Sequence, residues 1–138
     1  MIREINELEL LSVYELMRQL RPHISSEQFV DLYRQASKTN QYTLYAYYEA
    51  DHCIGLMGIR YMHDYVHQYH LYIDDLVVSE TNRSKGTGAK LLKFAEELAQ
   101  KKGCTGLRLC TGVENKAAMR FYERENWKSR AVVFKKTL

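Results

Sequence analysis

The chain has 138 residues, of which 46% are hydrophobic and 27% are charged, and its formal net charge is +3. A chain of this length fits one globular domain, and its composition argues against a disordered protein. Three cysteines without a C-x-x-C pair argue against a disulfide framework and against a zinc knuckle. We therefore expect a single domain over residues 1–138.

Two further features exclude classes of partner. No apolar run approaches the roughly 20 residues that a membrane span needs, and the first ten residues carry charges where a signal peptide is apolar. This pattern predicts a cytoplasmic protein with no membrane contact. The positive charge is concentrated at 83–102, with six Lys or Arg and two Glu. Nucleic-acid binding would need several such stretches, so a small polyphosphate ligand explains this one better.

The chain begins with signals for a short strand and two helices. Residues 2–5 fit a strand, and capping-box patterns predict that helices begin just after Asn6 and just after Ser25. The first of these helices should end near Leu20, because Pro22 follows. Three segments rich in aromatic and β-branched residues then predict an antiparallel meander. These segments are 42–49, 54–61 and 70–78.

The helical period returns beyond Gly88, where apolar and charged residues separate onto two faces up to Gly103. A strand, a helix and a final strand are expected after it, at 106–111, 115–125 and 131–137. The predicted order is β-α-α-β-β-β-α-β-α-β, which is an α/β (α+β) fold with helices packed on a mixed sheet.

A basic turn with two glycines, reading R-S-K-G-T-G at 83–88, follows the third meander strand and opens directly into the amphipathic helix. Backbone N–H groups in such a turn point into one concavity, and the helix N-terminus adds roughly half a positive charge. Gly86 and Gly88 let the backbone approach a ligand closely. The turn therefore predicts a site for a pyrophosphate.

The strand at 72–78 and the pattern Arg83-x-x-Gly86-x-Gly88 together resemble the acetyl-CoA-binding motif of the GNAT superfamily of N-acetyltransferases. Ser84 stands where a glycine is common in that family. The resemblance implies a mostly antiparallel sheet flanked by helices, acetyl-CoA as the cosubstrate and no metal.

A second motif lies near the C-terminal end, where Asn115-x-x-Ala118-x-x-Phe121-Tyr122 resembles the last helix of the family. The resemblance is sharp from Tyr72 onward, and the first half of the chain matches in element order only. It implies a set of residues that bind acetyl-CoA. These are Leu76, Val77, Val78, Arg83, Ser84, Lys85, Gly86, Thr87, Gly88, Ala89, Asn115, Ala118 and Phe121.

Acetyl transfer to an amine needs a proton acceptor, because an alkylammonium has a pKa near ~10 and only the neutral amine attacks a thioester. Alternation along a strand puts Tyr72 and Asp74 on one face and Asp75 on the other. The acidic pair is similar to that of diamine acetyltransferases, which implies that Asp74 accepts the proton. The alternative is that both acids only pair with neighbouring groups. Asp75, Tyr72 and Glu114 are expected to bind the acceptor, with Glu114 as a reserve base.

The departing thiolate needs a proton, and the family places a tyrosine of the last helix near the sulfur. Tyr122 has this position, so the resemblance implies that Tyr122 is the acid. The alternative is a core aromatic residue at helical spacing with Ala118. Three histidines, His63, His67 and His70, have the spacing of metal ligands on a helix, but their segment joins two strands and predicts no metal site.

The leading interpretation is an enzyme that moves the acetyl group of acetyl-CoA to a primary amine of a small molecule, with a polyamine-like or amino-sugar acceptor. The alternatives are a protein or peptide N-acetyltransferase and a non-catalytic CoA-binding regulatory module. A nucleic-acid partner is not expected. Dimers are common in the GNAT superfamily, and a strand edge could mediate a homodimer.

Overall fold

The computed structural model describes all residues from Met1 to Leu138. Residues 1–108 form one compact unit, and residues 109–138 form a second. The elements are β1 (Ile2–Glu4), α1 (Leu10–Leu20), α2 (Ser26–Asn40), β2 (Thr43–Glu49), β3 (His52–Asp64), β4 (Gln68–Val78), α3 (Thr87–Lys101), β5 (Gly106–Leu109) and α4 (Lys116–Arg124), with short 3-10 turns at Glu7–Glu9 and Glu80–Asn82. None of the helices is long and apolar enough to cross a bilayer.

The five strands form one sheet in the order β1-β2-β3-β4-β5, and β1 to β4 are antiparallel neighbours. β5 runs in the same direction as β4. Thr105, just before β5, donates its N–H to the carbonyl of Tyr69 at 2.8 Å, and Arg108 lies over the ring of Tyr72. The predicted fold class, a mixed and mostly antiparallel sheet with helices, is confirmed.

Both predicted capping boxes are present. The side chain of Asn6 accepts a backbone N–H of the first 3-10 turn, and Glu9 bonds back to the N–H of Asn6. Ser25 and Gln28 make the same reciprocal pair at the start of α2. These bonds satisfy N–H groups that a helix start leaves without helical partners, so the local sequence determines where the helices begin.

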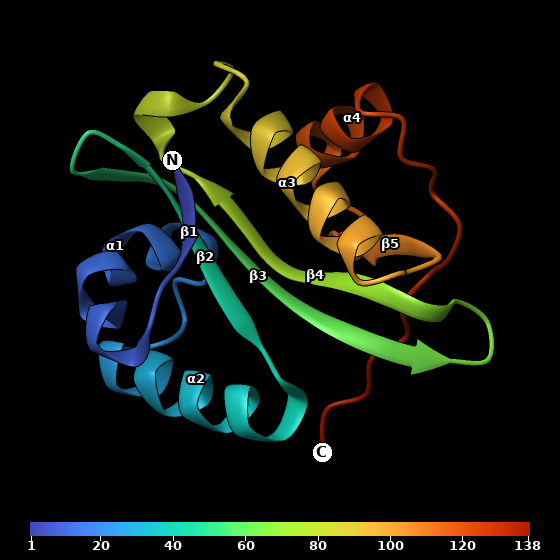
Figure 1. Cartoon of the computed structure of the whole chain (residues 1–138), viewed down its shortest axis with the longest axis horizontal. Helices are drawn as coiled ribbons and strands as arrows, with labels where there is room; N and C mark the ends of the chain where they lie inside the picture. Colours follow the sequence, from blue (N-terminus) through green and yellow to red (C-terminus); the bar gives the residue numbers. More distant parts are fainter. The chain divides into compact units, whose positions relative to one another are not determined.

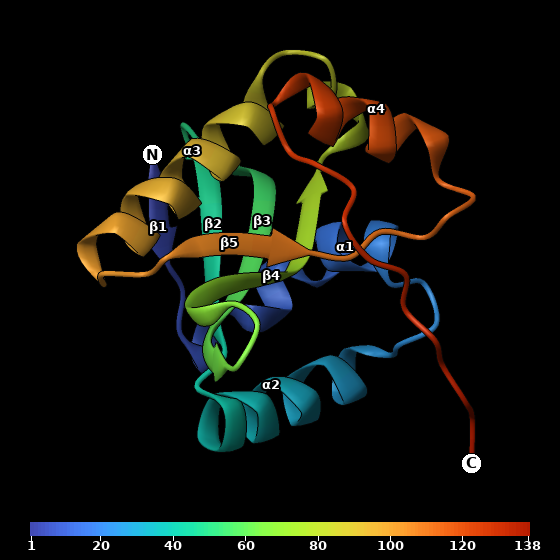
Figure 2. The same ribbon diagram turned by 90° about the vertical axis from the view of Figure 1, so that its right-hand side faces the viewer.

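Helices cover both faces of the sheet, with α1 and α2 on one face and α3 on the other (Figures 1 and 2). The core on the first face joins apolar side chains of α1 to strand residues such as Leu44 and Leu56. On the second face, a Cβ added at Gly55 would lie 2.9 Å from the Leu91 side chain, so α3 packs closely against β3. Because successive side chains of a strand point to opposite faces, each strand residue faces one of these two helix layers.

The final strand predicted at 131–137 is not formed, because residues 128–138 adopt no helix or strand. Val132, Val133 and Phe134 are 70%, 66% and 95% exposed. An apolar, β-branched segment becomes a strand only where a neighbouring strand supplies backbone partners, and residues 110–138 contain a helix but no strand. Periodicity alone therefore overestimated the last element.

Candidate active site

The turn at 83–88 has the backbone of an anion-binding site. Gly86 has φ +82, and nothing lies within 4 Å of a Cβ placed on it, so its backbone faces open space. The first helical N–H with a helical partner is that of Lys90, which donates to the carbonyl of Gly86 at 3.1 Å. The N–H groups before it are those that a helix start leaves for a ligand. A pyrophosphate of the kind that acetyl-CoA carries fits this donor set.

The side chains of the turn at 83–88 have different environments. Ser84 has φ +64, a left-handed conformation that favours glycine. Arg83 donates from Nε to the carbonyl of Val78 at 3.3 Å, so it braces the end of β4. Thr87 is buried, with its methyl group toward Gly55. Ser84 and Lys85 are exposed.

The edge of β4 that faces β5 is only partly covered by that strand. β5 has four residues and starts beside Tyr69, so it spans roughly 13 Å and ends about level with Ile73. The predicted cofactor residues Leu76, Val77 and Val78 lie beyond that point and pair with β3 on their other side. Their edge extends past β5, as a ligand that pairs with strand backbone would require.

β4 carries a β-bulge at the acidic pair. Gly58 of β3 pairs with Asp75. The next residue of β3, Ile59, pairs with Ile73, so Asp74 is an extra residue of β4 between the two pairs. Both acidic residues consequently line one cleft on the α1 side of the sheet. The expectation that Asp74 and Asp75 lie on opposite faces is therefore wrong, because a period of two holds only along an unbroken ladder.

Asp74 is held by Arg60 of β3 in a two-pronged ion pair. Arg60 donates from Nε to Oδ2 at 2.7 Å and from Nη2 to Oδ1 at 2.8 Å. This bond raises the pKa of the Arg60 guanidinium. The same guanidinium lies 5.3 Å from the centre of the Tyr72 ring, and that of Arg108 lies 4.8 Å from it. The cations over Tyr72 are thus arginines of the chain itself.

Asp75 is held by two groups from other elements. Arg21, at the end of α1, donates from Nε to Oδ1 at 3.1 Å and from Nη2 to the Asp74 carbonyl at 2.9 Å. Tyr42 donates its hydroxyl to Oδ2 at 2.7 Å. Burial and the nearby carboxylate raise the pKa of Tyr42 well above its usual value, so it remains a proton donor at neutral pH.

Gly58 is what lets Tyr42 reach Asp75. A Cβ at Gly58 would lie 1.9 Å from the Tyr42 hydroxyl oxygen and 2.4 Å from the ring carbon that bears it. No side chain larger than hydrogen fits between this ring and β3. The Tyr42 and Gly58 pair is therefore part of the construction of the site.

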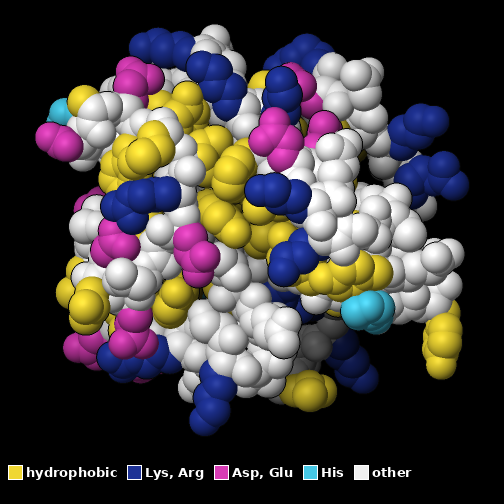
Figure 3. Space-filling model, viewed as in Figure 1, with side chains coloured by type: hydrophobic (Ala, Val, Ile, Leu, Met, Phe, Trp, Pro, Cys, Tyr) yellow, Lys and Arg dark blue, Asp and Glu magenta, His cyan; other side chains and the backbone are white.

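These groups lie in a cleft of about 450 Å³ between the helix pair and the sheet, which we call the ion-pair cleft. Its walls combine apolar side chains of α1 and α2 with the charged groups of β3 and β4. The lining residues are Met17, Arg21, His23, Ile24, Phe29, Leu32, Tyr33, Ala36, Asn40, Tyr42, Arg60, Asp74 and Asp75. On the α1 and α2 side of the face shown in Figure 3, Lys and Arg intermix with Asp and Glu.

The sequence interpretation missed Arg21, Tyr42 and Arg60. They come from three segments and share no motif, so no local pattern connects them. One signal was readable, because Arg60 follows a buried apolar run of β3 and a charge at such a position needs a partner.

The remaining predicted residues lie in the unit formed by residues 109–138. Asn115 caps α4, with its Oδ1 accepting the N–H of Ala118 at 3.1 Å, so it has a structural role whatever it binds. The ring of Tyr122 lies 5.2 Å from that of Phe121, and burial raises the pKa of Tyr122. Glu114 is exposed. Asn126 has φ +68, a left-handed conformation in which helices often end.

A cluster of side chains and a surface depression lie outside the turn and the ion-pair cleft. At the β3–β4 hairpin, Asp64, His67 and His70 bring ligand-type atoms within 4.8 Å of one another. Arg108 already donates to His70 Nε2 at 3.0 Å there.

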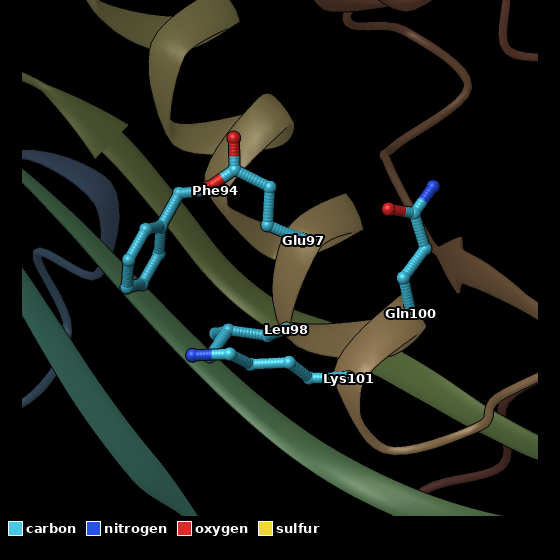
Figure 4. A pocket seen from close by; sticks show the side chains of 5 residues that line it. All are labelled: Phe94, Glu97, Leu98, Gln100 and Lys101. Atoms are coloured by element: carbon cyan, nitrogen blue, oxygen red, sulfur yellow. The ribbon is translucent and has the colours of Figure 1, made fainter.

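A depression of about 520 Å³ lies along α3, lined by five side chains of that helix alone (Figure 4). It groups no acids or bases from several elements, and Phe94 in it packs edge-on against Tyr45.

Comparison with known proteins agrees with this architecture. Residues 10–126 match the acetyltransferase (GNAT) family. The uncharacterized N-acetyltransferase YhdJ of Bacillus subtilis is 33% identical over 109 residues, which cover 79% of this chain and 77% of that protein. The aminoalkylphosphonate N-acetyltransferase of Salmonella typhimurium is 33% identical over 87 residues, 60% of this chain and 56% of the relative. The fold also resembles that of aminoglycoside N-acetyltransferase AAC(6')-Iy in complex with CoA, with a TM-score of 0.87, 18% identity, and coverage of 99% and 93% of the two chains.

The protein is an acyltransferase, and acetyl-CoA is its cosubstrate. More specifically, the chain belongs to the GNAT family of N-acetyltransferases.

Proposed function

We propose that this enzyme moves the acetyl group to a primary amine of a small molecule bound in the ion-pair cleft. The observation that carries the proposal is the arrangement along β4. The bulge at Asp74 opens into the cleft, and Val78, four residues later, leads into the anion-binding turn at 83–88. One strand thus serves both regions, and the two ligands can meet along it.

The proposed roles follow the proton balance of the reaction. Acetyl-CoA supplies the acetyl group as a thioester, and the amine loses one proton while the thiol gains one. Asp74, at the bulge, takes the amine proton through water, and Asp75 and Tyr72 orient the acceptor. Tyr122 gives the proton to the thiol, in agreement with its raised pKa, which keeps its hydroxyl protonated. Glu114 is the reserve base.

Acetyl-CoA binding is assigned mainly to backbone groups of β4 and the turn, with a contribution from α4. The phosphate-binding part is proposed at the 83–88 turn and the start of α3. The full proposed set is Leu76, Val77, Val78, Arg83, Ser84, Lys85, Gly86, Thr87, Gly88, Ala89, Asn115, Ala118 and Phe121.

The size of the cleft supports a small acceptor over a protein or peptide. Pockets of roughly 300–1,000 Å³ suit small molecules, and the ion-pair cleft has about 450 Å³. Relatives and structural neighbours include proteins named for aminoalkylphosphonate and aminoglycoside acetylation, and these names also refer to small acceptors. A homodimer and a cytoplasmic location stay predictions, and light scattering of the purified chain measures the first.

An acetyl-CoA-dependent thiol-release assay over a panel of amines tests the proposal, with Asp74→Asn as the diagnostic variant. We expect turnover to fall about 100-fold, and the defect to shrink at high pH, where the amine is neutral without help. Asp31→Asn is the matched control, since Asp31 is an exposed residue of α2 that pairs only weakly, at 3.7 Å, with Arg34. A defect that does not change with pH would instead make Asp74 an acceptor-binding residue. Absence of thiol release with every amine would refute the proposed function.

A further inference from the structure

We propose that the acceptor is a zwitterion, an amine that also carries a carboxylate or phosphonate group, and that Arg21 and Arg60 bind this anionic group. The inference rests on the proposed function and specifies its substrate class. It departs from the polyamine-like acceptor that the acidic pair suggested in the sequence.

The first step is that both carboxylates of the ion-pair cleft already have an arginine partner. Both oxygens of Asp74 accept from Arg60, at 2.7 and 2.8 Å. One oxygen of Asp75 accepts from Arg21 at 3.1 Å, and the other accepts from Tyr42 at 2.7 Å. A second ammonium group on the acceptor would either lie beside a bound arginine or displace it from its carboxylate. Both arrangements put two cations side by side, which is unfavourable in a partly buried site.

The second step is that the arginines retain donors. Each guanidinium has five N–H bonds, and the hydrogen bonds to the two aspartates use two of each. The side chain of Arg21 is 41% exposed, whereas that of Asp75 is 16% exposed. The cationic partner therefore faces the open cleft while the carboxylate lies behind it. An anionic group can bind Arg21 without breaking any existing bond.

The third step is the charge of the lining groups. Two arginines and two aspartates leave the polar end of the cleft neutral when His23 is uncharged. A doubly charged diamine would find no net attraction there. A zwitterion brings one charge of each sign, and its carboxylate or phosphonate matches the planar fork of a guanidinium.

The test uses four acceptors of similar length: γ-aminobutyrate, aminopropylphosphonate, putrescine and butylamine. We expect kcat/KM for at least one anionic acceptor to exceed that for butylamine by about tenfold or more, as one charge-assisted hydrogen bond would give. Comparison of the two anionic acceptors shows whether the cleft prefers a carboxylate or a phosphonate. Putrescine preferred over both anionic acceptors would overturn the inference and leave the proposed function intact. No turnover with any amine would refute both.

The variant Arg21→Gln assigns the effect to the arginine. We expect kcat/KM for the preferred anionic acceptor to fall about tenfold or more beyond any loss for butylamine, because butylamine has no anion to bind. Arg21→Lys keeps the charge and should recover part of the loss. Arg18→Gln is the matched control, because Arg18 is an exposed α1 residue outside the cleft that pairs with Glu15 at 3.8 Å. Equal losses for both acceptors in Arg21→Gln would contradict anion binding by this residue.

Discussion

The 83–88 turn and the ion-pair cleft lie at the same strand but are built in different ways. The turn is contiguous in sequence, and its proposed binding groups are backbone N–H groups placed by left-handed residues and a helix start. The cleft draws its charged side chains from α1, β3 and β4, and these bond mainly to one another. A backbone site thus depends on local conformation, whereas a side-chain site depends on tertiary packing. Substitutions should therefore act differently in the two regions.

The strongest loss is expected at the proposed phosphate site of the turn, in a variant that still folds. Gly88→Asp places a negative side chain in the first turn of α3, where it repels a phosphate but favours the helix itself by up to ~1 kcal/mol. We expect acetyl-CoA affinity to fall about 100-fold or more, as loss of two charge-assisted hydrogen bonds would produce, with little change in melting temperature. Calorimetric titration with acetyl-CoA measures this.

Gly106→Asp is the matched control for that change. It introduces the same charge at a glycine where nothing lies within 4 Å of an added Cβ. Acetyl-CoA affinity should stay near wild type in this variant. An unchanged affinity in folded Gly88→Asp would move the phosphate site away from the turn.

The next prediction asks whether chemistry needs a group outside both regions. Tyr122→Phe keeps the ring and removes the hydroxyl, so we expect turnover to fall about 100-fold while the KM for acetyl-CoA stays similar. Steady-state kinetics under conditions where chemistry limits the rate provide the measurement. Wild-type turnover in this variant would leave Tyr122 as a packing residue. Trp127→Leu controls for loss of packing, because its ring lies 6.1 Å from that of Tyr122.

A third prediction concerns the packing on which the cleft depends. Gly58→Ala forces a methyl group against the Tyr42 ring, so we expect a loss of about 3 kcal/mol in the free energy of unfolding. Denaturant unfolding measures it. In a Tyr42→Leu background the added methyl should cost clearly less, because the ring is gone. Additive losses would show that the clash is not with Tyr42.

The smallest effect is expected at the β3–β4 hairpin, away from both ligand regions. Backbone N–H bonds, chiefly that of His67, lower the pKa of Asp64 from 3.8 to about 2. A carboxyl with a depressed folded pKa stabilises the fold above its unfolded pKa, and that stability is lost as the pH falls through the folded pKa. Asp64→Asn should therefore melt below wild type at neutral pH, and the difference should vanish between about pH 4 and pH 2. Melting curves across this range that stay parallel would contradict the assignment.

The same contrast explains what the sequence could predict. Helix starts at Asn6 and Ser25 and the turn at 83–88 were predicted because their determinants are local. The bulge at Asp74 was not, since an extra residue in a ladder depends on the partner strand and leaves no trace in the alternation of side chains. The ion pairs of the cleft join residues up to 54 positions apart, and no short pattern encodes them. The final strand failed because strand propensity does not provide a partner.

The contact between Tyr42 and Gly58 also limits how β2 and β3 can pair. Leu44 is opposite Gly58, and a slip of one residue would turn the apolar side chains of a strand to the wrong face. A slip of two residues keeps the faces correct, so hydrophobic burial alone discriminates poorly against it. That slip would bring Leu56 or Arg60 beneath the Tyr42 ring, where a Cβ has no room. Because Gly58 has no side chain, the native register leaves room for the Tyr42 ring. Registers shifted by two residues do not, so they are unfavourable during folding.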